Sequence, residues 1–384
     1  MLTALLGGPA SSQNQYGPMP MIHVPDTSIE IPGQAGHKGH TNHVILLNPA
    51  GGLGPNGGMN PAQMWSFYGM NPPGGSNVIA IVDAYHYPTA LNDFNYFSGY
   101  FGLPVEPSAN PLASTNQVFQ VVYATGTQPA TNGGWAQEAA LDIEWAHAMA
   151  PNAKIVLIEA ASNSYLDLMT AIDVAGSLPG VKEVSMSWSS GEFRSETTFD
   201  AHFPRSNGIV YFASSGDTGG SVQYPAVSPN VVAVGGTTVN TYASGYFASE
   251  TGWSGSGGGT SKYEPKPSYQ TGVSNTPKKR GVPDISCDAN PSTGVSVYDT
   301  TEYGGMSGWM VFGGTSVSSP CMAGMVNLAG HFYADSTAEL TAIYGNLGTA
   351  NLRDITSGKA GRYYCASGWD FVTGVGSPRG TGGI

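Results

Sequence analysis

The chain has 384 residues, enough to bury a sizeable core. Its 14 Lys and Arg against 26 Asp and Glu give a formal net charge of -12, so its surface would repel a phosphate backbone and nucleic acid is not an expected partner. Only 10% of the residues are charged, and a surface with few ionic contacts loses little when carboxylates protonate, which favours work in an acidic medium.

Residues 1–44 are rich in Gly, Pro, Ser, Asn and Gln and show little apolar periodicity. We interpret them as an N-terminal extension that is draped on the body or partly flexible. Within it, His37, His40 and His43 recur at every third position. Such a tract can bind a transition metal, but no carboxylate or cysteine joins it, and we favour a flexible loop. No signal peptide is recognised, and no run of 18 apolar residues predicts a membrane span.

Residues 45–384 are expected to form one α/β domain. Short, nearly continuous apolar runs predict buried parallel strands at Asn77–Tyr85, Lys154–Ala160, Glu183–Trp188, Gly208–Ser215 and Asn230–Gly236. Helices are expected at Trp135–Met149, at Tyr165–Ala175 and from Ser316 to about Tyr333. This alternation predicts a doubly wound, mostly parallel sheet with helices on both faces. Catalytic groups in such folds gather on the loops after the strands, at their carboxyl ends.

The first of these helices carries two acidic residues, Glu138 and Asp142, at i and i+4. They therefore share one face of the helix, although they repel each other and no basic residue stands beside them. A solvated acidic face is the ordinary explanation. A buried carboxylate pair that holds one proton is the functional alternative.

Two further stretches follow predicted strands. "FGGTSVSSP" (Phe312–Pro320) is a glycine turn that opens an apolar helix, so Ser316 would stand near unpaired N–H groups and the positive end of the dipole. It is either a nucleophile or an ordinary N-cap serine. "FASSGDTGG" (Phe212–Gly220) leaves Asp217 just past a strand end, where it either bonds to the local backbone of a turn or serves the site.

A nucleophilic serine needs a base, which is usually histidine. His86 and His147 are the histidines that lie near these motifs in the sequence, and by the helical count His147 faces away from Glu138. The His-Gly-Thr stretch of subtilisin is missing from the sequence. The carboxylates therefore remain as the candidates for the base, and ordinary subtilisin chemistry is disfavoured.

The chain resembles the sedolisins, the serine-carboxyl peptidases that include kumamolisin and tripeptidyl peptidase I and share the fold of subtilisin. The resemblance covers about residues 60–380. It rests on seven motifs in this order: "QEAALDIEWAHAMAPNAKI", "SSGDTGG", "YPAVSPNVVAVGGT", "SGGGTS", "VPDISCDANPSTG", "GGTSVSSP" and "RDITSG…SGWDFVTGVGSP".

The resemblance implies that Ser316 is the nucleophile and Glu138 its general base. Asp142 would orient Glu138 and share a proton with it, and Asp217 would line the oxyanion hole. Asp83 stands at the strand end where subtilisin-like enzymes keep their triad aspartate, but it is not a triad member in the sedolisin pattern and we leave it out.

The resemblance also implies one structural Ca²⁺ near the C-terminus. Hard oxygen ligands of this mixture suit that ion. Carboxylates would come from Asp354 and Asp370, and backbone oxygens from Ile355, Ala366 and Gly368. A loop capped by a carboxylate without metal is the alternative. The three cysteines, Cys287, Cys321 and Cys365, form neither a CxxC pair nor a zinc pattern and allow at most one disulfide within the chain.

The expected function is therefore that of an acid-acting serine-carboxyl endopeptidase on unfolded or extended proteins, working through an acyl-enzyme. A tripeptidyl exopeptidase with the same triad and an idle binding protein on the same scaffold are the alternatives. We expect a monomer in a secreted or other acidic extracytoplasmic location, with protein or peptide substrates and neither nucleic acid nor membrane as a partner.

Overall fold

The computed structural model describes residues 21–48 and 51–384. The expectation of a partly flexible extension falls in part on residues 1–20, which lie outside the described residues. The helices of the described part are α1 (Pro61–Tyr68), α2 (Ala90–Phe101), α3 (Gly133–Met149), α4 (Tyr165–Ser177), α5 (Thr315–Ala329) and α6 (Ser336–Gly345).

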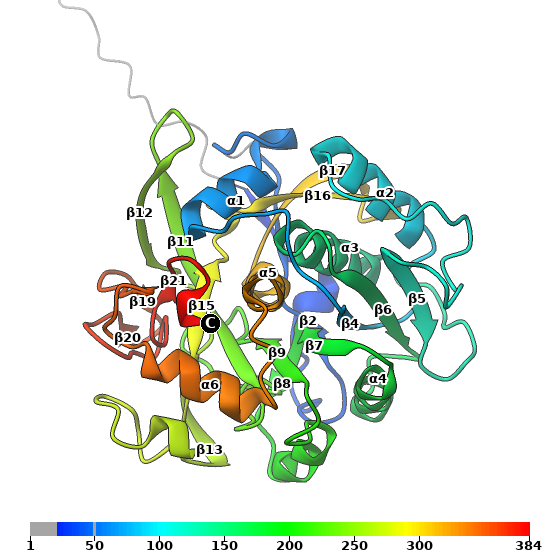
Figure 1. Cartoon of the computed structure of the whole chain (residues 1–384). Helices are drawn as coiled ribbons and strands as arrows, with labels where there is room; N and C mark the ends of the chain where they lie inside the picture. The colour runs from blue at the N-terminus through cyan, green and yellow to red at the C-terminus, as the bar shows by residue number, and fades with distance from the viewer. Residues whose placement is uncertain (1–20, 49–50) are drawn as a thin grey trace, which may run out of the picture.

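An eight-stranded sheet forms the centre of the molecule (Figure 1). Its order is β12-β11-β9-β7-β4-β6-β5, with β15 also paired to β11, and all its pairings are parallel except that of β11 with β12. The strands are β4 (Val78–Ala84), β5 (Phe119–Tyr123), β6 (Lys154–Ala160), β7 (Val181–Met186), β9 (Val210–Ser214), β11 (Val232–Thr241), β12 (Phe247–Gly252) and β15 (Ile285–Asp288). The prediction of a mostly parallel, doubly wound sheet is confirmed.

The nearly continuous apolar runs arise because both faces of the sheet are covered. On β4, Ile79 and Ile81 face a core shared with α1, α2, α3 and α5, whereas Ala80 and Val82 face a second core shared with α4. The same alternation separates the residues of β6. Figure 1 shows α3 and α5 packed against each other, with α4 on the other side of the sheet.

Two predicted boundaries change for local reasons. The segment Glu183–Trp188 is not one strand, because β7 ends at Met186 and β8 (Trp188–Gly191) leaves the central sheet to pair with β2 (His40–Thr41) and β10 (Gln223–Tyr224). The helix expected to reach about Tyr333 ends at Ala329, since Gly330 adopts a left-handed φ of 73° and caps it.

Smaller sheets surround this centre. One has the order β1-β3-β17-β16, and the others pair β13 with β14, β18 with β21, and β19 with β20. Their bounds are β1 (Ile22–His23), β3 (Val44–Leu46), β13 (Gly259–Pro265), β14 (Lys279–Val282), β16 (Val295–Tyr303), β17 (Met306–Gly313), β18 (Leu352–Arg353), β19 (Lys359–Ala360), β20 (Tyr363–Tyr364) and β21 (Ser377–Pro378). Strands β2 and β3 tie the segment of residues 21–48 to the body through β8 and β17, and β1 pairs with β3 within the segment.

In the described part of the chain, no helix combines the length and the apolar character that crossing a bilayer requires. All three cysteines are buried free thiols.

Candidate active site

Ser316 is the second residue of α5, directly behind the turn that starts the helix. It is fully buried, and its Oγ donates a hydrogen bond to the backbone oxygen of Ser187 at 3.2 Å. The preceding Gly314 has a φ of 96°, and a Cβ on it would overlap the carbonyl oxygen of Asn42 and Asp217 Oδ2. Glycine is therefore required both by the backbone conformation and by the crowding at the start of α5.

Glu138 and Asp142 lie one turn apart on α3, and both side chains are fully buried. Apart from Gly133 the whole helix is buried, so a solvated acidic face is not the explanation for this pair. Burial, and then the negative charges of Asp83 and Glu138, raise the pKa of Asp142 well above its ordinary value. The buried surroundings of the pair therefore favour the protonated form of Asp142.

Asp83, which the sequence analysis left out, belongs to the same buried cluster. It lies at the end of β4 and is 1% exposed, and neither of its carboxyl oxygens has a hydrogen-bond partner among the described residues. Burial raises its pKa well above the ordinary value, followed by the charges of Glu138 and Glu159. Asp83, Glu138 and Asp142 therefore form one buried cluster of carboxyl groups, and the exclusion of Asp83 from the triad stays a prediction.

Asp217 follows β9 and reaches the start of α5. Its Oδ1 accepts hydrogen bonds from the N–H of Thr315 at 2.7 Å and from Thr315 Oγ1 at 2.8 Å. The residue is partly exposed, but its carboxyl end is shielded and Oδ2 has no partner among the described residues. Burial raises the pKa of Asp217 to about 8, against the lowering effect of the two Thr315 donors. Below that pH the carboxyl group can carry a proton that it donates.

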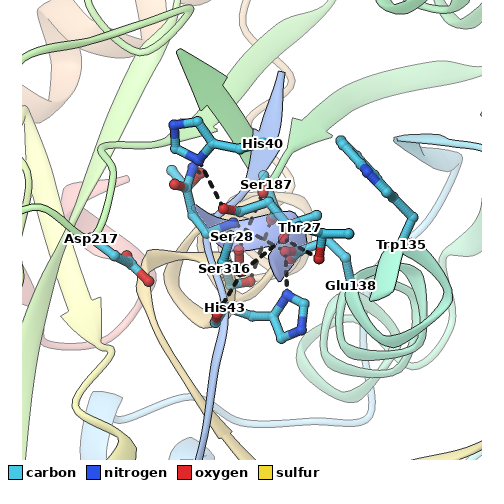
Figure 2. Close-up of polar contacts among 12 residues, drawn as sticks. Thr27, Ser28, His40, His43, Trp135, Glu138, Ser187, Asp217 and Ser316 are labelled. Carbon is cyan, nitrogen blue, oxygen red and sulfur yellow. Dashed lines mark hydrogen bonds and ion pairs between the residues drawn. The ribbon is translucent and has the colours of Figure 1, made fainter. Parts of the chain in front are cut away.

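A segment of the N-terminal extension runs through this site, and the sequence analysis missed it. His43 is fully buried, and its Nδ1 lies 2.9 Å from Glu138 Oε2 (Figure 2). The N–H of Asn42 lies 3.2 Å from the same oxygen. The flexible-loop interpretation is therefore wrong for His40 and His43, since His40 is 8% exposed within β2. The available signal was a polar Asn-His pair placed directly before the apolar residues of β3.

No histidine is bonded to the hydroxyl of Ser316 in the described structure. His43 turns Nδ1 to Glu138, while its Nε2 has no hydrogen-bond partner among the described residues. His86 bonds to Glu159 at 2.8 Å, and His147 bonds to the carbonyl oxygen of Pro104 at 2.9 Å.

Asn42 reveals how closely the serine and the glutamate approach each other. Its N–H contacts Glu138 Oε2, and its carbonyl oxygen accepts a hydrogen bond of 3.0 Å from the N–H of Ser316. The two atoms belong to one residue, so Glu138 and Ser316 flank a single position on an extended chain. The contacts bring Glu138, Ser316 and Asp217 together, whereas the expected calcium loop lies elsewhere.

At that loop, the carboxylates of Asp354 and Asp370 flank one turn. Asp354 accepts hydrogen bonds from Ser367 Oγ at 3.1 Å and from the N–H of Gly368 at 3.1 Å, and Asp370 Oδ2 accepts one from the N–H of Ala366 at 3.0 Å. The fifth predicted ligand, Ile355, is buried next to the loop. No group of three or more His, Cys, Asp and Glu side chains gathers as a metal site within residues 21–48 and 51–384. Two carboxylates beside backbone carbonyls fit Ca²⁺ in kind, because that ion takes oxygen ligands of both types.

Comparison with known proteins identifies one family and several relatives that agree with one another. Residues 124–370 match the subtilase family. The chain is 28% identical over 364 residues to sedolisin of Pseudomonas sp. (strain 101), covering 83% of this chain and 60% of that protein. It is 33% identical over 279 residues to kumamolisin of Bacillus sp. (strain MN-32), covering 63% of this chain and 49% of that protein.

Among solved structures, Pseudomonas sedolisin in complex with two molecules of pseudo-iodotyrostatin superposes with a TM-score of 0.71. The identity is 27%, and the match covers 84% of this chain and 95% of that chain. The full-length relatives are longer: the chain spans 60% of the length of the sedolisin and 49% of the length of the kumamolisin.

Proposed function

We propose that this chain, which belongs to the subtilase family, is a serine-carboxyl endopeptidase that acts in acid, as its similarity to sedolisin and kumamolisin suggests. The proposal rests on one observation: the N–H of Asn42 contacts Glu138, and the carbonyl oxygen of Asn42 accepts the N–H of Ser316. The peptidase domain is taken as residues 45–384, preceded by the extension of residues 1–44.

In this mechanism Ser316 Oγ attacks the carbonyl carbon of a substrate. Glu138 takes the hydroxyl proton and later gives it to the leaving amine, and water then hydrolyses the acyl-enzyme. In the described state Ser316 Oγ is bonded to Ser187 and Glu138 to His43. The hydroxyl therefore has to rotate from the Ser187 oxygen towards Glu138 before it can pass on its proton.

The buried carboxyl groups suit a mechanism that runs in acid. Two carboxyls in one low-dielectric site do not both ionise readily, so Asp142 holds a proton while Glu138 accepts one. Histidine would be protonated and useless as a base at the same pH. Asp217, protonated below about pH 8, donates a hydrogen bond to the developing oxyanion, and the N–H of Ser316 supplies the second donor.

An endopeptidase is favoured over a tripeptidyl exopeptidase by the path of the extension. The described chain continues on the amino side of Asn42 through β2 and on to residue 21. A cleft that admits this much chain is not closed after three residues. We propose extended or unfolded protein segments as substrates, a monomeric enzyme and a secreted or other acidic extracytoplasmic location.

We also propose a structural Ca²⁺ held by Asp354 and Asp370 with backbone oxygens of Ile355, Ala366 and Gly368. When bound, the ion would supply positive charge that ties the exposed Asp354 to the buried Asp370. The N–H groups of Ala366 and Gly368 that now bond to these carboxylates would have to turn away from the ion.

The test is hydrolysis of an unfolded protein at pH 4 and pH 7, with Ser316→Ala and Glu138→Gln compared with the exposed-serine control Ser292→Ala. We expect cleavage in acid by the wild-type protein and by Ser292→Ala, and losses of several orders of magnitude in the other two variants. Cleavage that survives Ser316→Ala would contradict the proposal. So would a folded wild-type protein, supplied with Ca²⁺, that cleaves nothing at either pH.

A further inference from the structure

The extension lies in the site in the manner of a bound substrate. Residues of β2 pair antiparallel with β8, His40 opposite Ser189 and Thr41 opposite Trp188. The next residue, Asn42, donates its N–H to the backbone oxygen of Ser187 at 3.2 Å and accepts the N–H of Ser316 on its carbonyl oxygen at 3.0 Å. Strand addition of this kind is a general way to hold a peptide, and it brings the peptide bond between Asn42 and His43 to Ser316.

The side chain of Asn42 fills a small polar pocket beside that bond. Its Nδ2 donates hydrogen bonds to Ser189 Oγ at 2.9 Å and to Ser214 Oγ at 2.8 Å. Ser189 Oγ in turn donates to Gln223 Oε1 at 2.6 Å and lies 3.1 Å from Asn42 Oδ1. Asn42, Ser189, Ser214 and Gln223 are each no more than 3% exposed, so the pocket is built and closed to water.

The direction of the hydrogen bonds makes this pocket selective. Asn42 Nδ2 donates to the oxygens of both Ser189 and Ser214, and Ser189 Oγ can return its proton to Asn42 Oδ1 or give it to Gln223 Oε1. An Asp in the same place lacks the amide that donates to Ser189 Oγ and Ser214 Oγ. An Ala or Leu side chain would deprive the buried Ser214 Oγ of the hydrogen bond that it accepts from Asn42, which is costly in a site that water does not reach.

We propose that the pocket of Ser189, Ser214 and Gln223 recognises an asparagine on the amino side of the cleaved bond, and that the bond between Asn42 and His43 is the first substrate it presents to Ser316. The proposal rests on the proposed peptidase function and names its substrate class. The enzyme thus cleaves extended chains after asparagine, beginning with its own.

The step is ordinary hydrolysis. Ser316 Oγ bonds to the carbonyl carbon of Asn42, its proton passes to Glu138, and the bond to the nitrogen of His43 breaks as that nitrogen takes up the proton. Water then releases Asn42 as a carboxyl group and restores the serine. Before the cut, Asn42 and His43 fill the site and bond to Glu138, which denies the site to any other chain.

The new N-terminus would remain on the body. Residues Val44, Ile45 and Leu46 pair with Gly313, Phe312 and Val311 of β17, so the peptidase that results begins at His43 with β3 in place. Residues 21–42 are then held by the pairing of β2 with β8 and of β1 with β3, and their release opens the cleft.

The first experiment purifies the full chain at neutral pH, shifts it to pH 4 and follows its intact mass. We expect a fragment that starts at His43, formed at a rate independent of protein concentration. Ser316→Ala and Asn42→Leu should stay uncut at this bond, while Ser292→Ala is cut like the wild type. Circular dichroism identifies a variant that has merely unfolded. Removal of the extension at another bond, or cutting of Asn42→Leu at this same bond at the wild-type rate, would overturn the proposal.

The second experiment measures kcat/KM of the processed enzyme on matched peptides with Asn, Asp, Gln, Ala or Leu before the cleaved bond. Sites that hydrogen-bond a substrate group strongly reject analogues lacking it, so we expect Asn to exceed Ala by roughly 100-fold or more. In Ser214→Ala this ratio should fall by roughly 10-fold or more, and in Ser292→Ala it should not change. An active enzyme without preference for Asn would refute the pocket alone, whereas an enzyme inactive on every peptide would refute the peptidase function as well.

Discussion

Replacing Glu339 by Gln should make the stability of the protein less sensitive to pH. Glu339 lies in the first turn of α6, is fully buried, and has no hydrogen-bond partner for either carboxyl oxygen among the described residues. Burial alone raises its pKa from 4.5 to about 8. The folded protein therefore holds a proton here that the unfolded chain releases near its ordinary pKa.

The size of the effect follows from linkage. Since the folded pKa is raised, the stabilisation is complete below the unfolded pKa of 4.5 and is lost as the pH rises towards about 8. Each unit of pKa difference corresponds to about 1.4 kcal/mol, so the wild-type protein loses about 3 kcal/mol at this one residue between pH 4 and pH 7. Glutamine has the same shape and no ionisation, so this loss should vanish.

Urea unfolding at pH 4 and pH 7 measures the difference. Any cost of burying the glutamine amide is common to both pH values and cancels when each protein is compared with itself. We expect the drop in unfolding free energy from pH 4 to pH 7 to be about 3 kcal/mol smaller in Glu339→Gln than in the wild type, and unchanged in the exposed control Glu302→Gln. Equal drops in the wild type and in Glu339→Gln would refute the reasoning.

Three further predictions concern other charged groups. Asp217→Ala should lower kcat by roughly 10²–10³ at pH 4 because an oxyanion donor is lost, whereas Asp217→Asn should retain most of the activity because its amide still donates. Steady-state kinetics of the two variants tests this, and equal losses of kcat would contradict the assigned role. Asp354→Asn should lower the melting temperature when Ca²⁺ is present but leave it unchanged when a chelator is present. If chelator does not change the melting temperature of the wild-type protein, the ion is excluded. Arg280→Met should destabilise the protein by about 3–5 kcal/mol in urea unfolding, since it removes the positive charge that pairs with the buried Asp284 through two bonds of 2.6 Å. No change would show that the Ala233 N–H and the Tyr344 hydroxyl, which also donate to Asp284, suffice.

The central sheet could be predicted from sequence because its strands are covered on both faces. Burial on two faces demands unbroken apolar runs, and the run Lys154–Ala160 matches β6 residue for residue. Ser187 illustrates the limit. The apolar pattern continues past it, but the chain changes sheets there, and only the partners β2 and β10 reveal the change.

The site was predictable where its chemistry lies within one element. Glu138 and Asp142 share a helix face by spacing alone, and Ser316 stands at a recognisable turn. Asp83 and His43 were not predictable in the same way, because their proximity to Glu138 is set by tertiary packing across 55 residues or more of chain. Strands of two residues such as β1 and β2 are too short to show a periodic pattern, so the sequence did not predict where the extension lies.

The pairing of Ser316 with Glu138 is tested most directly by trapping the nucleophile. The processed enzyme is incubated at pH 4 with a fluorophosphonate, which reacts covalently with an activated serine, and the modified residue is located by peptide mass spectrometry. The mechanism predicts one adduct, on Ser316, that is lost in Glu138→Gln and in acid-unfolded protein but persists in Ser292→Ala. An adduct on another serine, or one on Ser316 that forms equally fast without Glu138, would contradict it.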